Sequence, residues 1–278
     1  MNSKIAWLGC LASAGLALSA AGQVVTTFDN GTEGWSVSGR DDISGAGGNP
    51  GANMDVLLID VFGADIRNNT NADFLGDYTA NGSFTMSIDI RTNNIDFFGQ
   101  QVVRDLVIEF RDYTNDQGYP WTSVWLNLGL LDASASGDNG DGWVTYTFTV
   151  EDPNAADLPA GWGGYGYEDP VTFEPILPPG RTFGSVLASV DEVAFSTFVP
   201  GFFFGFTNFA LQIDNITLTP AGNECAADVN GDGAVTPADF TAWVAAFNAR
   251  APECDQNGDG SCTPADFTAW VANFNAGC

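Results

Sequence analysis

The sequence predicts a mainly β protein, in which an antiparallel β-sandwich precedes a small helical domain. From Val24 to Thr219, short apolar alternations are separated by Gly, Pro, Asn and Asp, without helical periodicity. A near-identical repeat with a spacing of 27 residues then occupies the C-terminal end. An apolar content of 45% in 278 residues is enough for a buried core. We assign residues 23–220 to the sandwich and 221–278 to the repeat domain.

The predicted strands each have one apolar and one polar face, as expected where one side of a sheet packs on the core. A segment near the end of the sandwich changes its apolar phase between Ile213 and Ile216, which predicts a β-bulge near Asp214 and Asn215. Strands this numerous, without intervening helices, favour an antiparallel sandwich. The alternating segments have apolar positions at Phe84, Met86, Ile88 and Ile90; Leu106, Ile108 and Phe110; Leu126, Leu128 and Leu130; and Val144, Tyr146, Phe148 and Val150.

Residues 1–22 have the pattern of an export signal. Lys4 precedes an uncharged stretch, and the small residues Ala20, Ala21 and Gly22 suit a signal peptidase. Two alternatives stay open: a membrane anchor, for which the apolar run is short, and a lipoprotein signal at Cys10, which lacks a good lipobox. In each case we expect an exported protein, secreted or attached to the cell surface.

A second uncharged run, from Ala194 to Ile213, is long enough to span a bilayer. It contains Pro200, Gly201 and Gly205 and is rich in Phe rather than Leu, which favours two buried strands around a turn. After removal of the signal we therefore expect no membrane span.

The formal net charge of −27 limits the partners of this chain. Lys4 is the only lysine, so that seven arginines oppose 35 acidic residues once the signal is removed. Such a surface repels nucleic acid and anionic membranes. The absence of histidine excludes Ser-His-Asp and Cys-His catalysis and argues against a catalytic zinc or non-haem iron site. Carboxylates are the remaining candidates for acid–base chemistry.

The two repeats begin at Asp228 and Asp255, and 17 of their 21 aligned positions are identical. Each starts with a calcium-loop pattern, in which oxygen ligands at positions 1, 3, 5, 7, 9 and 12 surround a glycine at position 6. Because carboxylates crowded into one loop repel one another until a cation binds, we expect two Ca²⁺ ions in this domain and a need for them in folding. The predicted ligands are Asp228, Asn230, Asp232, the Ala234 carbonyl, Thr236 and Asp239 in the first loop, and Asp255, Asn257, Asp259, the Ser261 carbonyl, Thr263 and Asp266 in the second.

Each loop is followed by an amphipathic helix, whose apolar residues recur at i, i+3, i+4 and i+7. These residues are Phe240, Trp243, Val244 and Phe247 in the first copy, and Phe267, Trp270, Val271 and Phe274 in the second. Only residues 249–254 separate the first helix from the second loop, so there is no room for the entering helix of an EF-hand.

A duplicated loop and helix, with Asp at position 12, resembles the dockerin family over residues 225–278, in the bacterial variant that begins and ends on cysteine. The resemblance implies a non-catalytic domain that binds a cohesin-like module on a scaffold or at a cell surface, in either of two orientations. At loop positions 10 and 11 this chain has Pro and Ala instead of the family's Ser/Thr recognition pair. This departure points to a partner other than an ordinary cohesin.

The four cysteines that remain after removal of the signal all lie in this domain, and an exported protein can form disulfides. We expect Cys225–Cys278 to join the ends of the domain and Cys254–Cys262 to staple the second loop. The other two pairings stay open. Metal binding by the thiols is the weaker alternative, because their spacing fits no zinc motif.

Three motifs of the sandwich resemble the laminin B (laminin IV type A) family in order and spacing: FDNGTEGWSVSG, GGNPGANMDV and DFLGDYTANGSFTMSIDIRT. The resemblance fades between Asn94 and Pro179 and resumes at VLASVDEV and IDNITL. It implies a jelly-roll sandwich akin to galactose-binding and carbohydrate-binding modules, without catalytic activity. Such sandwiches often hold a structural calcium between the opening and closing strands, for which Asp29 and Asp214 are candidates; the alternative is that both cap turns.

A glycine-rich segment, AGWGGYGYEDP, carries the candidate ligand-binding residues Trp162, Tyr165, Tyr167 and Glu168. Aromatic rings stack on sugars, although rings folded back on the sandwich are the alternative. We therefore predict a secreted, non-catalytic binding or structural module for a glycan or matrix, anchored through its calcium-dependent tail. The alternative is a polysaccharide hydrolase, with carboxylates supplied by Glu109, Glu168 and Glu174.

Overall fold

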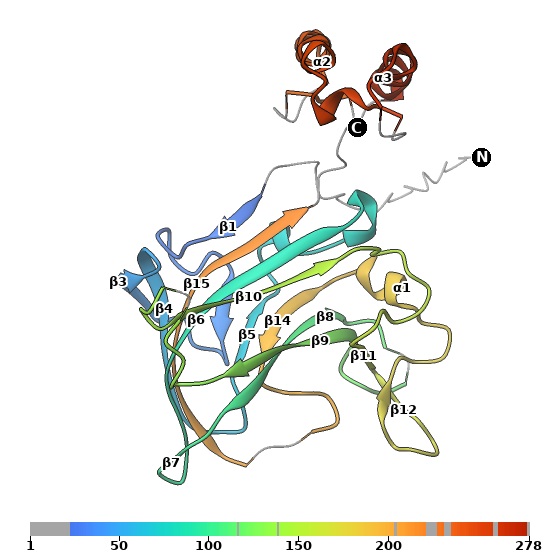
Figure 1. Cartoon of the computed structure of the whole chain (residues 1–278). Coiled ribbons are helices and arrows are strands. Elements are labelled where there is room, and N and C mark those ends of the chain that lie inside the picture. Colours follow the sequence, from blue (N-terminus) through green and yellow to red (C-terminus); the bar gives the residue numbers. More distant parts are fainter. Residues whose placement is uncertain are drawn as a thin grey trace, which may run out of the picture.

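The structure, a computed structural model, describes residues 23–115, 117–137, 139–202, 205–220, 227–230, 235–257 and 261–276 (Figure 1). The expected export signal lies outside these residues. The strands are β1 (Val24–Thr26), β2 (Trp35–Val37), β3 (Ile43–Gly48), β4 (Gly51–Val61), β5 (Asp65–Asn68), β6 (Phe84–Phe97), β7 (Gln100–Gln101), β8 (Arg104–Asp112), β9 (Thr122–Leu131), β10 (Trp143–Val150), β11 (Trp162–Tyr165), β12 (Tyr167–Glu168), β13 (Pro175–Ile176), β14 (Glu192–Ser196) and β15 (Thr207–Pro220). The α-helices are α1 (Phe183–Leu187), α2 (Pro237–Ala249) and α3 (Pro264–Ala276).

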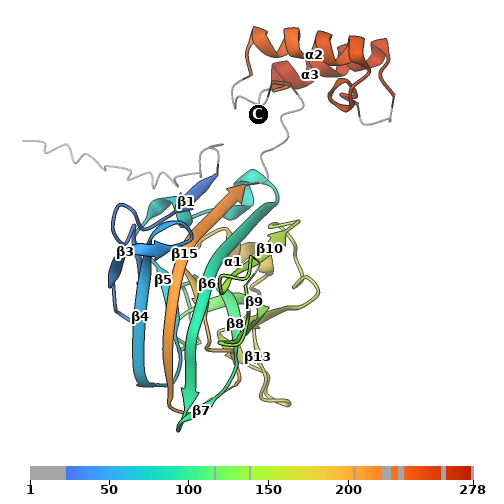
Figure 2. The same ribbon diagram turned by 60° about the vertical axis from the view of Figure 1, so that its left-hand side comes forward.

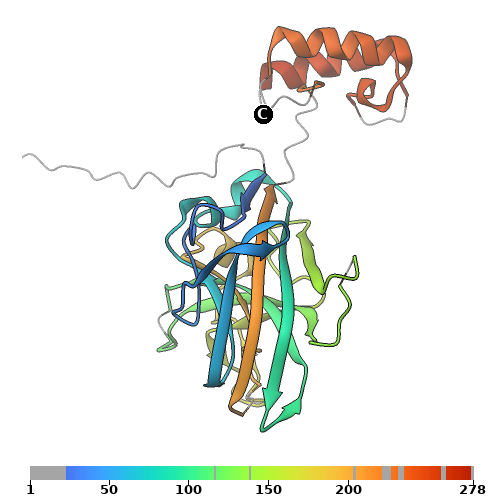
Figure 3. The same ribbon diagram turned by 90° about the vertical axis from the view of Figure 1, so that its left-hand side faces the viewer.

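Two antiparallel sheets pack face to face and form the sandwich (Figures 1 and 2). The seven-stranded sheet has the order β10-β6-β15-β4-β3, with β1 paired to β15 and β7 paired to β6. Its longest strands, β6 and β15, lie side by side next to β4 (Figure 3). The six-stranded sheet has the order β11-β9-β8-β14-β5-β2, and a short hairpin joins β12 to β13. The antiparallel jelly-roll sandwich that the sequence predicts is therefore confirmed.

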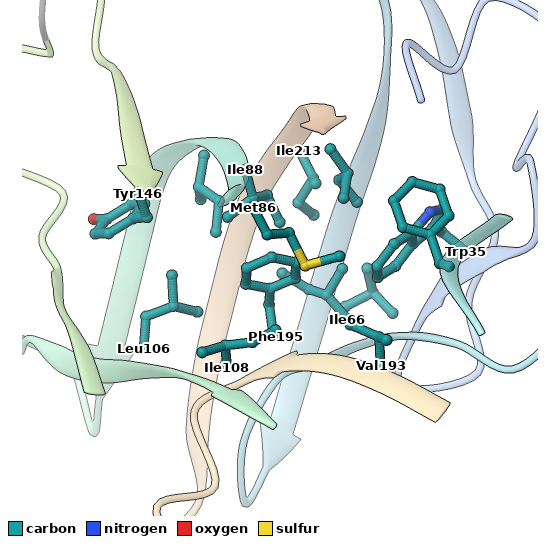
Figure 4. Close-up of a cluster of buried hydrophobic side chains, with 14 of the residues drawn as sticks. Trp35, Ile66, Met86, Ile88, Leu106, Ile108, Tyr146, Val193, Phe195 and Ile213 are labelled. Carbon is teal, nitrogen blue, oxygen red and sulfur yellow. The ribbon is translucent and has the colours of Figure 1, made fainter. Parts of the chain in front are cut away.

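The core lies between the two sheets and is formed by the apolar side chains of their inner faces (Figure 4). Met86 from β6 and Ile213 from β15 come from one sheet, and Ile108 from β8 and Phe195 from β14 come from the other. All four side chains are fully buried. Trp35 closes one side of this cluster, where its ring meets Phe195 and other aromatic residues.

The predicted bulge is present in β15. The register between β15 and β6 shifts between Asp214 and Thr217, and Asn215 there has a positive φ of 47°. The connection between β14 and β15 lies within the uncharged run, as expected for two strands around a turn. Among the described residues, no helix has the length and apolarity that a membrane crossing requires.

A second shift, in β9, was not predicted. The ladder between β8 and β9 slips where Leu106 pairs with Gly129 and Val107 pairs with Asn127. Because the slip inserts one extra residue, Leu130 is 52% exposed and Leu131 is buried in its place. The prediction that Leu130 points inward is therefore wrong.

The C-terminal part contains one helix after each predicted calcium loop, as the periodicity indicates. Helix α2 begins with a capping box: the side chain of Thr236 accepts a hydrogen bond from Ala238 N, and the Asp239 carboxylate accepts one from Thr236 N. Pro237 occupies the first helical position, where the missing N–H costs nothing.

The helices α2 and α3 are joined by aromatic contacts and by two reciprocal hydrogen bonds. Trp243 lies 6.4 Å from Trp270, measured between ring centroids. Trp243 Nε1 donates to the carbonyl of Cys254 at 3.2 Å, and Trp270 Nε1 donates to the carbonyl of Ala227 at 3.3 Å. Each tryptophan thus holds the residue that precedes the predicted calcium loop of the other repeat.

We predict that Phe195→Ala lowers the free energy of unfolding by about 3–5 kcal/mol, because it leaves a cavity in the shared core. Phe98→Ala is the matched control: Phe98 is 84% exposed, and its removal should change stability by less than about 0.5 kcal/mol. Urea denaturation of both variants measures the difference. Equal effects would contradict the placement of the core.

Candidate functional site

The outer face of the six-stranded sheet carries charged side chains because of the alternation along β8. Phe110 points into the core, so Glu109 and Arg111 point away from it. Residues directly opposite each other in an antiparallel ladder share a face of the sheet. Arg111 lies opposite Ser123 of β9 and Glu192 of β14, which places all three on the outer face.

The Arg111 guanidinium is buried among three carboxylates. Its Nη1 donates to Glu192 Oε1 at 2.6 Å, and its Nε donates to Glu109 Oε2 at 2.7 Å. Its Nη2 donates to Asp65 Oδ1 at 3.1 Å. Arg67 adds a second, more exposed guanidinium 3.9 Å from Glu192 Oε2.

Burial disfavours the charged form of Arg111, yet the pKa of this guanidinium is raised. The negative charges of Glu109 and Asp65, and the hydrogen bonds to Glu109 and Glu192, outweigh the loss of hydration. A buried ion pair is stable only where hydrogen bonds satisfy the groups that have lost water. This network meets that condition and holds its side chains in one arrangement.

Trp121 connects the charged network to a group of aromatic rings. Its Nε1 donates to Glu109 Oε1 at 2.9 Å, and Arg111 Cζ lies 4.4 Å from the centre of its ring. The ring of Tyr165 lies 6.0 Å from Trp121 and 5.5 Å from Tyr119, measured between centroids. All three rings are only partly buried. We call Arg111, its three carboxylates and these three rings the outer-face site.

Burial, together with the negative charge of Glu109, raises the pKa of the Tyr165 hydroxyl. The hydroxyl is therefore protonated at neutral pH and can donate a hydrogen bond. A ring that keeps an exposed surface and a polar end suits contact with a molecule that has both apolar faces and hydroxyl groups.

Two connections leave the sheet beside the outer-face site: the hairpin of β12 and β13, and residues 197–202 after β14. They meet where Gly201 packs on Pro175, so closely that a Cβ on Gly201 would lie 2.9 Å from Pro175 Cδ. Thr197 ties the second connection to the sheet, since its Oγ1 accepts a hydrogen bond from Ala64 N at 2.9 Å.

The structure separates the four residues that the sequence proposed as ligand contacts. Tyr165 belongs to the outer-face site, and Tyr167 and Glu168 lie in the neighbouring strand β12. Trp162 instead packs inward, where its ring stacks on Phe110 at 6.2 Å. Because Tyr165 is three positions after Trp162 along a strand, their side chains point to opposite faces. Trp162 is partly buried and packs against the core, on the face opposite Tyr165.

The three glutamates considered for hydrolysis do not share one environment. Glu109 is buried in the outer-face site, where Ser123 and Trp121 donate to one of its oxygens and Arg111 donates to the other. Glu168 and Glu174 are exposed on the hairpin of β12 and β13.

Sequence reasoning did not find most of the outer-face site, namely Asp65, Arg111, Tyr119, Trp121 and Glu192. One signal was available: Glu109 and Arg111 occupy successive outward positions of a predicted strand, where opposite charges two residues apart share a face. Asp65 on β5 and Glu192 on β14 are distant in sequence from β8, so their approach to Arg111 follows from strand order.

The structure brings Asp29 and Asp214 to opposite sides of one turn. Asp214 Oδ2 accepts a hydrogen bond from Asn49 N at 2.5 Å, and Asp29 Oδ1 accepts one from Ala52 N at 3.0 Å. Burial raises the pKa of Asp214 to about 6; backbone hydrogen bonds oppose this shift, and the charges of Asp89 and Asp29 add to it. Both aspartates cap this turn, and a cation between them would remove the repulsion.

The described parts of the two predicted calcium loops bring position 12 next to position 3. Asp239 Oδ1 accepts a hydrogen bond from Asn230 N at 3.2 Å, and Asp266 Oδ1 accepts one from Asn257 N at 3.3 Å. Hydrogen bonds from Thr263 and other loop groups lower the pKa of Asp266. This carboxylate is therefore ionised at neutral pH, as a calcium ligand must be.

Several predicted calcium ligands lie outside the described residues. Asp232 and Ala234 of the first loop and Asp259 of the second belong to this group. Within the ranges that the structure does describe, no three side chains of Asp, Glu, His or Cys are placed to hold a metal ion. The described residues thus do not form a complete set of calcium ligands at either loop or at Asp29 and Asp214. Calcium binding stays a prediction.

One of the two predicted disulfides falls within the described residues. Cys254 and Cys262 are bonded, with their Cα atoms 5.6 Å apart, so the second loop is stapled as expected. Cys225 and Cys278 lie outside the described residues.

No protein-family model matches this sequence, and no curated protein is similar to it. Among solved structures, one similar protein is a family 11 carbohydrate-binding module from Clostridium thermocellum, in complex with a β-1,3-1,4-mixed-linked tetrasaccharide. It is 15% identical to this chain, with a TM-score of 0.43, and the match covers 73% of this chain and 98% of that one. A xylan-binding domain of family 22 is 10% identical with a TM-score of 0.38 over 76% and 99%. An exo-β-agarase is 10% identical with a TM-score of 0.41 over 72% of this chain and 25% of its own. Likenesses this distant do not show a family.

We predict that Arg111→Met lowers the free energy of unfolding by about 3–5 kcal/mol, because it leaves three carboxylates without their cation. Arg111→Lys keeps the charge but loses the planar fork, and it should cost less. Arg40→Met is the control, since the pair of Arg40 with Asp42 is exposed and worth at most about 1 kcal/mol. Chemical denaturation measures all three. An Arg111→Met variant as stable as the unmodified chain would refute the network.

Proposed function

We propose that this chain is a secreted, non-catalytic glycan-binding module, whose sandwich binds sugar at the outer-face site. The observation that carries the proposal is the grouping of Trp121, Tyr165 and Tyr119 around a buried, hydrogen-bonded network. Aromatic faces stack on the apolar faces of sugar rings, and groups that are already fixed in place lose little entropy on binding. The few polar groups that converge on the site then orient the bound sugar.

The same network supports binding rather than hydrolysis. A glycosidase needs one carboxyl group that can give up a proton and another that is available to attack or to activate water. Both oxygens of Glu109 already accept hydrogen bonds, and both oxygens of Glu192 do so as well, from Arg111 and Asn69. Carboxylates held in this way orient Arg111 and Trp121. They are not placed to react.

We expect Trp121→Ala and Tyr165→Ala each to weaken retention on the bound polysaccharide at least tenfold, because one stacking surface is lost. Leu57→Ala is the control: Leu57 is 57% exposed on β4, in the other sheet, and its removal should leave retention unchanged. Affinity electrophoresis against a panel of polysaccharides, together with an assay for released reducing ends, measures binding and turnover. Release of sugar that is abolished by Glu109→Gln would favour the hydrolase instead.

We propose that the C-terminal domain attaches the sandwich to a protein partner in a calcium-dependent manner. The duplicated loops, the resemblance to dockerins and the reciprocal bonds of Trp243 and Trp270 support this role. The Pro and Ala at loop positions 10 and 11 favour a cohesin-like or other surface partner with a different recognition surface. A capture experiment from secreted and surface fractions, with calcium or with EDTA, tests the attachment.

We propose three calcium ions in all: one in each loop and one between Asp29 and Asp214. Calorimetric titration of the full chain should give a stoichiometry of about three, in line with that number of oxygen-rich sites. Asp214→Asn should remove one ion and leave the tail sites intact, whereas Asp239→Asn should remove one tail ion. An unchanged stoichiometry in either variant would contradict the site it was meant to remove.

A further inference from the structure

A groove lies between β6, β7 and the start of β8 on one side and the connection from β9 to β10 on the other. It has a volume of about 860 Å³ and is lined by Asn93, Gln101, Val102, Val103, Arg104, Asp132, Ala133 and Ser134. A second hollow of about 310 Å³ continues it, since Asn93 and Ala133 line both. The continuation adds Arg91 to the lining. No residue of the outer-face site lines either part.

Two of the seven arginines that remain after removal of the signal line this groove. Arg104 is 8% exposed and is held in place, as its Nη2 donates to Thr207 Oγ1 at 3.0 Å and its Nη1 donates to the Val103 carbonyl at 2.8 Å. The side chain of Arg91 packs closely against Gly142. A Cβ atom added to Gly142 would lie 3.1 Å from Arg91 Nε. Hydrogen bonds thus hold the guanidinium of Arg104, and the side chain of Arg91 packs against Gly142.

The carboxylates of the groove bond within their own loop. Asp132 Oδ1 accepts hydrogen bonds from the backbone N and the hydroxyl of Ser134, at 2.7 Å each. Asp141 Oδ1 accepts one from Trp143 N at 3.0 Å. Among the residues that the structure describes, Arg91 forms no ion pair, whereas Arg40, Arg67, Arg111 and Arg181 all do.

We propose that this groove binds an anionic glycan, with the carboxylate of a uronic acid residue at Arg91 and Arg104. A guanidinium binds a carboxylate through charge-assisted, bidentate hydrogen bonds. The amides of Asn93 and Gln101 suit sugar hydroxyls, and the exposed apolar wall at Val103 suits the C–H face of a sugar ring. In a chain with a formal net charge of −27, the guanidiniums of Arg91 and Arg104 bring positive charge into this groove, beside the carboxylates of Asp132 and Asp141.

The test is calorimetry of the calcium-loaded full chain with an oligogalacturonate and with the same oligosaccharide after reduction of its carboxyl groups. The acidic oligosaccharide should bind, and the reduced one should bind at least tenfold more weakly. Arg91→Gln should weaken binding of the acidic form at least tenfold. Ala133→Phe, which fills the groove without a change of charge, should do the same.

Arg40→Gln removes the same charge from an exposed turn and should leave the affinity unchanged. Trp121→Ala separates the two sites, because it should weaken binding at the outer-face site and leave uronate binding intact. Three results would each overturn the proposal, whatever the outcome at the outer-face site. The wild-type chain could fail to bind oligogalacturonate, or it could bind the reduced form equally well. The third result is an Arg91→Gln variant with wild-type affinity.

Discussion

The strict alternation of side chains along β8 and β14 couples the core of this protein to its candidate binding site. Phe110 and Val193 pack inward, and their neighbours Arg111 and Glu192 are thereby directed outward and opposite each other. A slip of one residue in this ladder would place a guanidinium in the core and a phenylalanine in solvent. The apolar core therefore fixes the register, and the register assembles the charged network.

The network in turn determines what the outer face can do. A buried guanidinium is tolerated only because three carboxylates surround it, and those carboxylates are held by Ser123, Trp121 and Asn69. The arrangement leaves rings at the surface and keeps reactive groups occupied. Such a surface is suited to recognition, and its rigidity limits the entropy lost when a ligand binds.

The helices of the C-terminal domain are stabilised by contacts between the two repeats. Two helices of this length would be marginal alone, and each is stabilised by contact with the other repeat. The reciprocal hydrogen bonds of Trp243 and Trp270 attach each helix to the start of the opposite loop. A calcium ion at either loop, as proposed, would therefore bind next to a residue that the other repeat already holds.

The sequence by itself determined the local features: the strand faces, the bulge at Asp214, the two helices and the staple between Cys254 and Cys262. Each depends on residues close together in the chain, where periodicity and spacing are direct signals. Only the tertiary structure decided which outward residues meet. Trp162 was proposed as a ligand contact and packs against the core, whereas Arg111, Trp121, Asp65 and Glu192 form a site of which the sequence marks only the outward positions of Glu109 and Arg111. The reason is strand order, since β8 pairs with β14 and β14 pairs with β5, although these three strands are far apart in the chain.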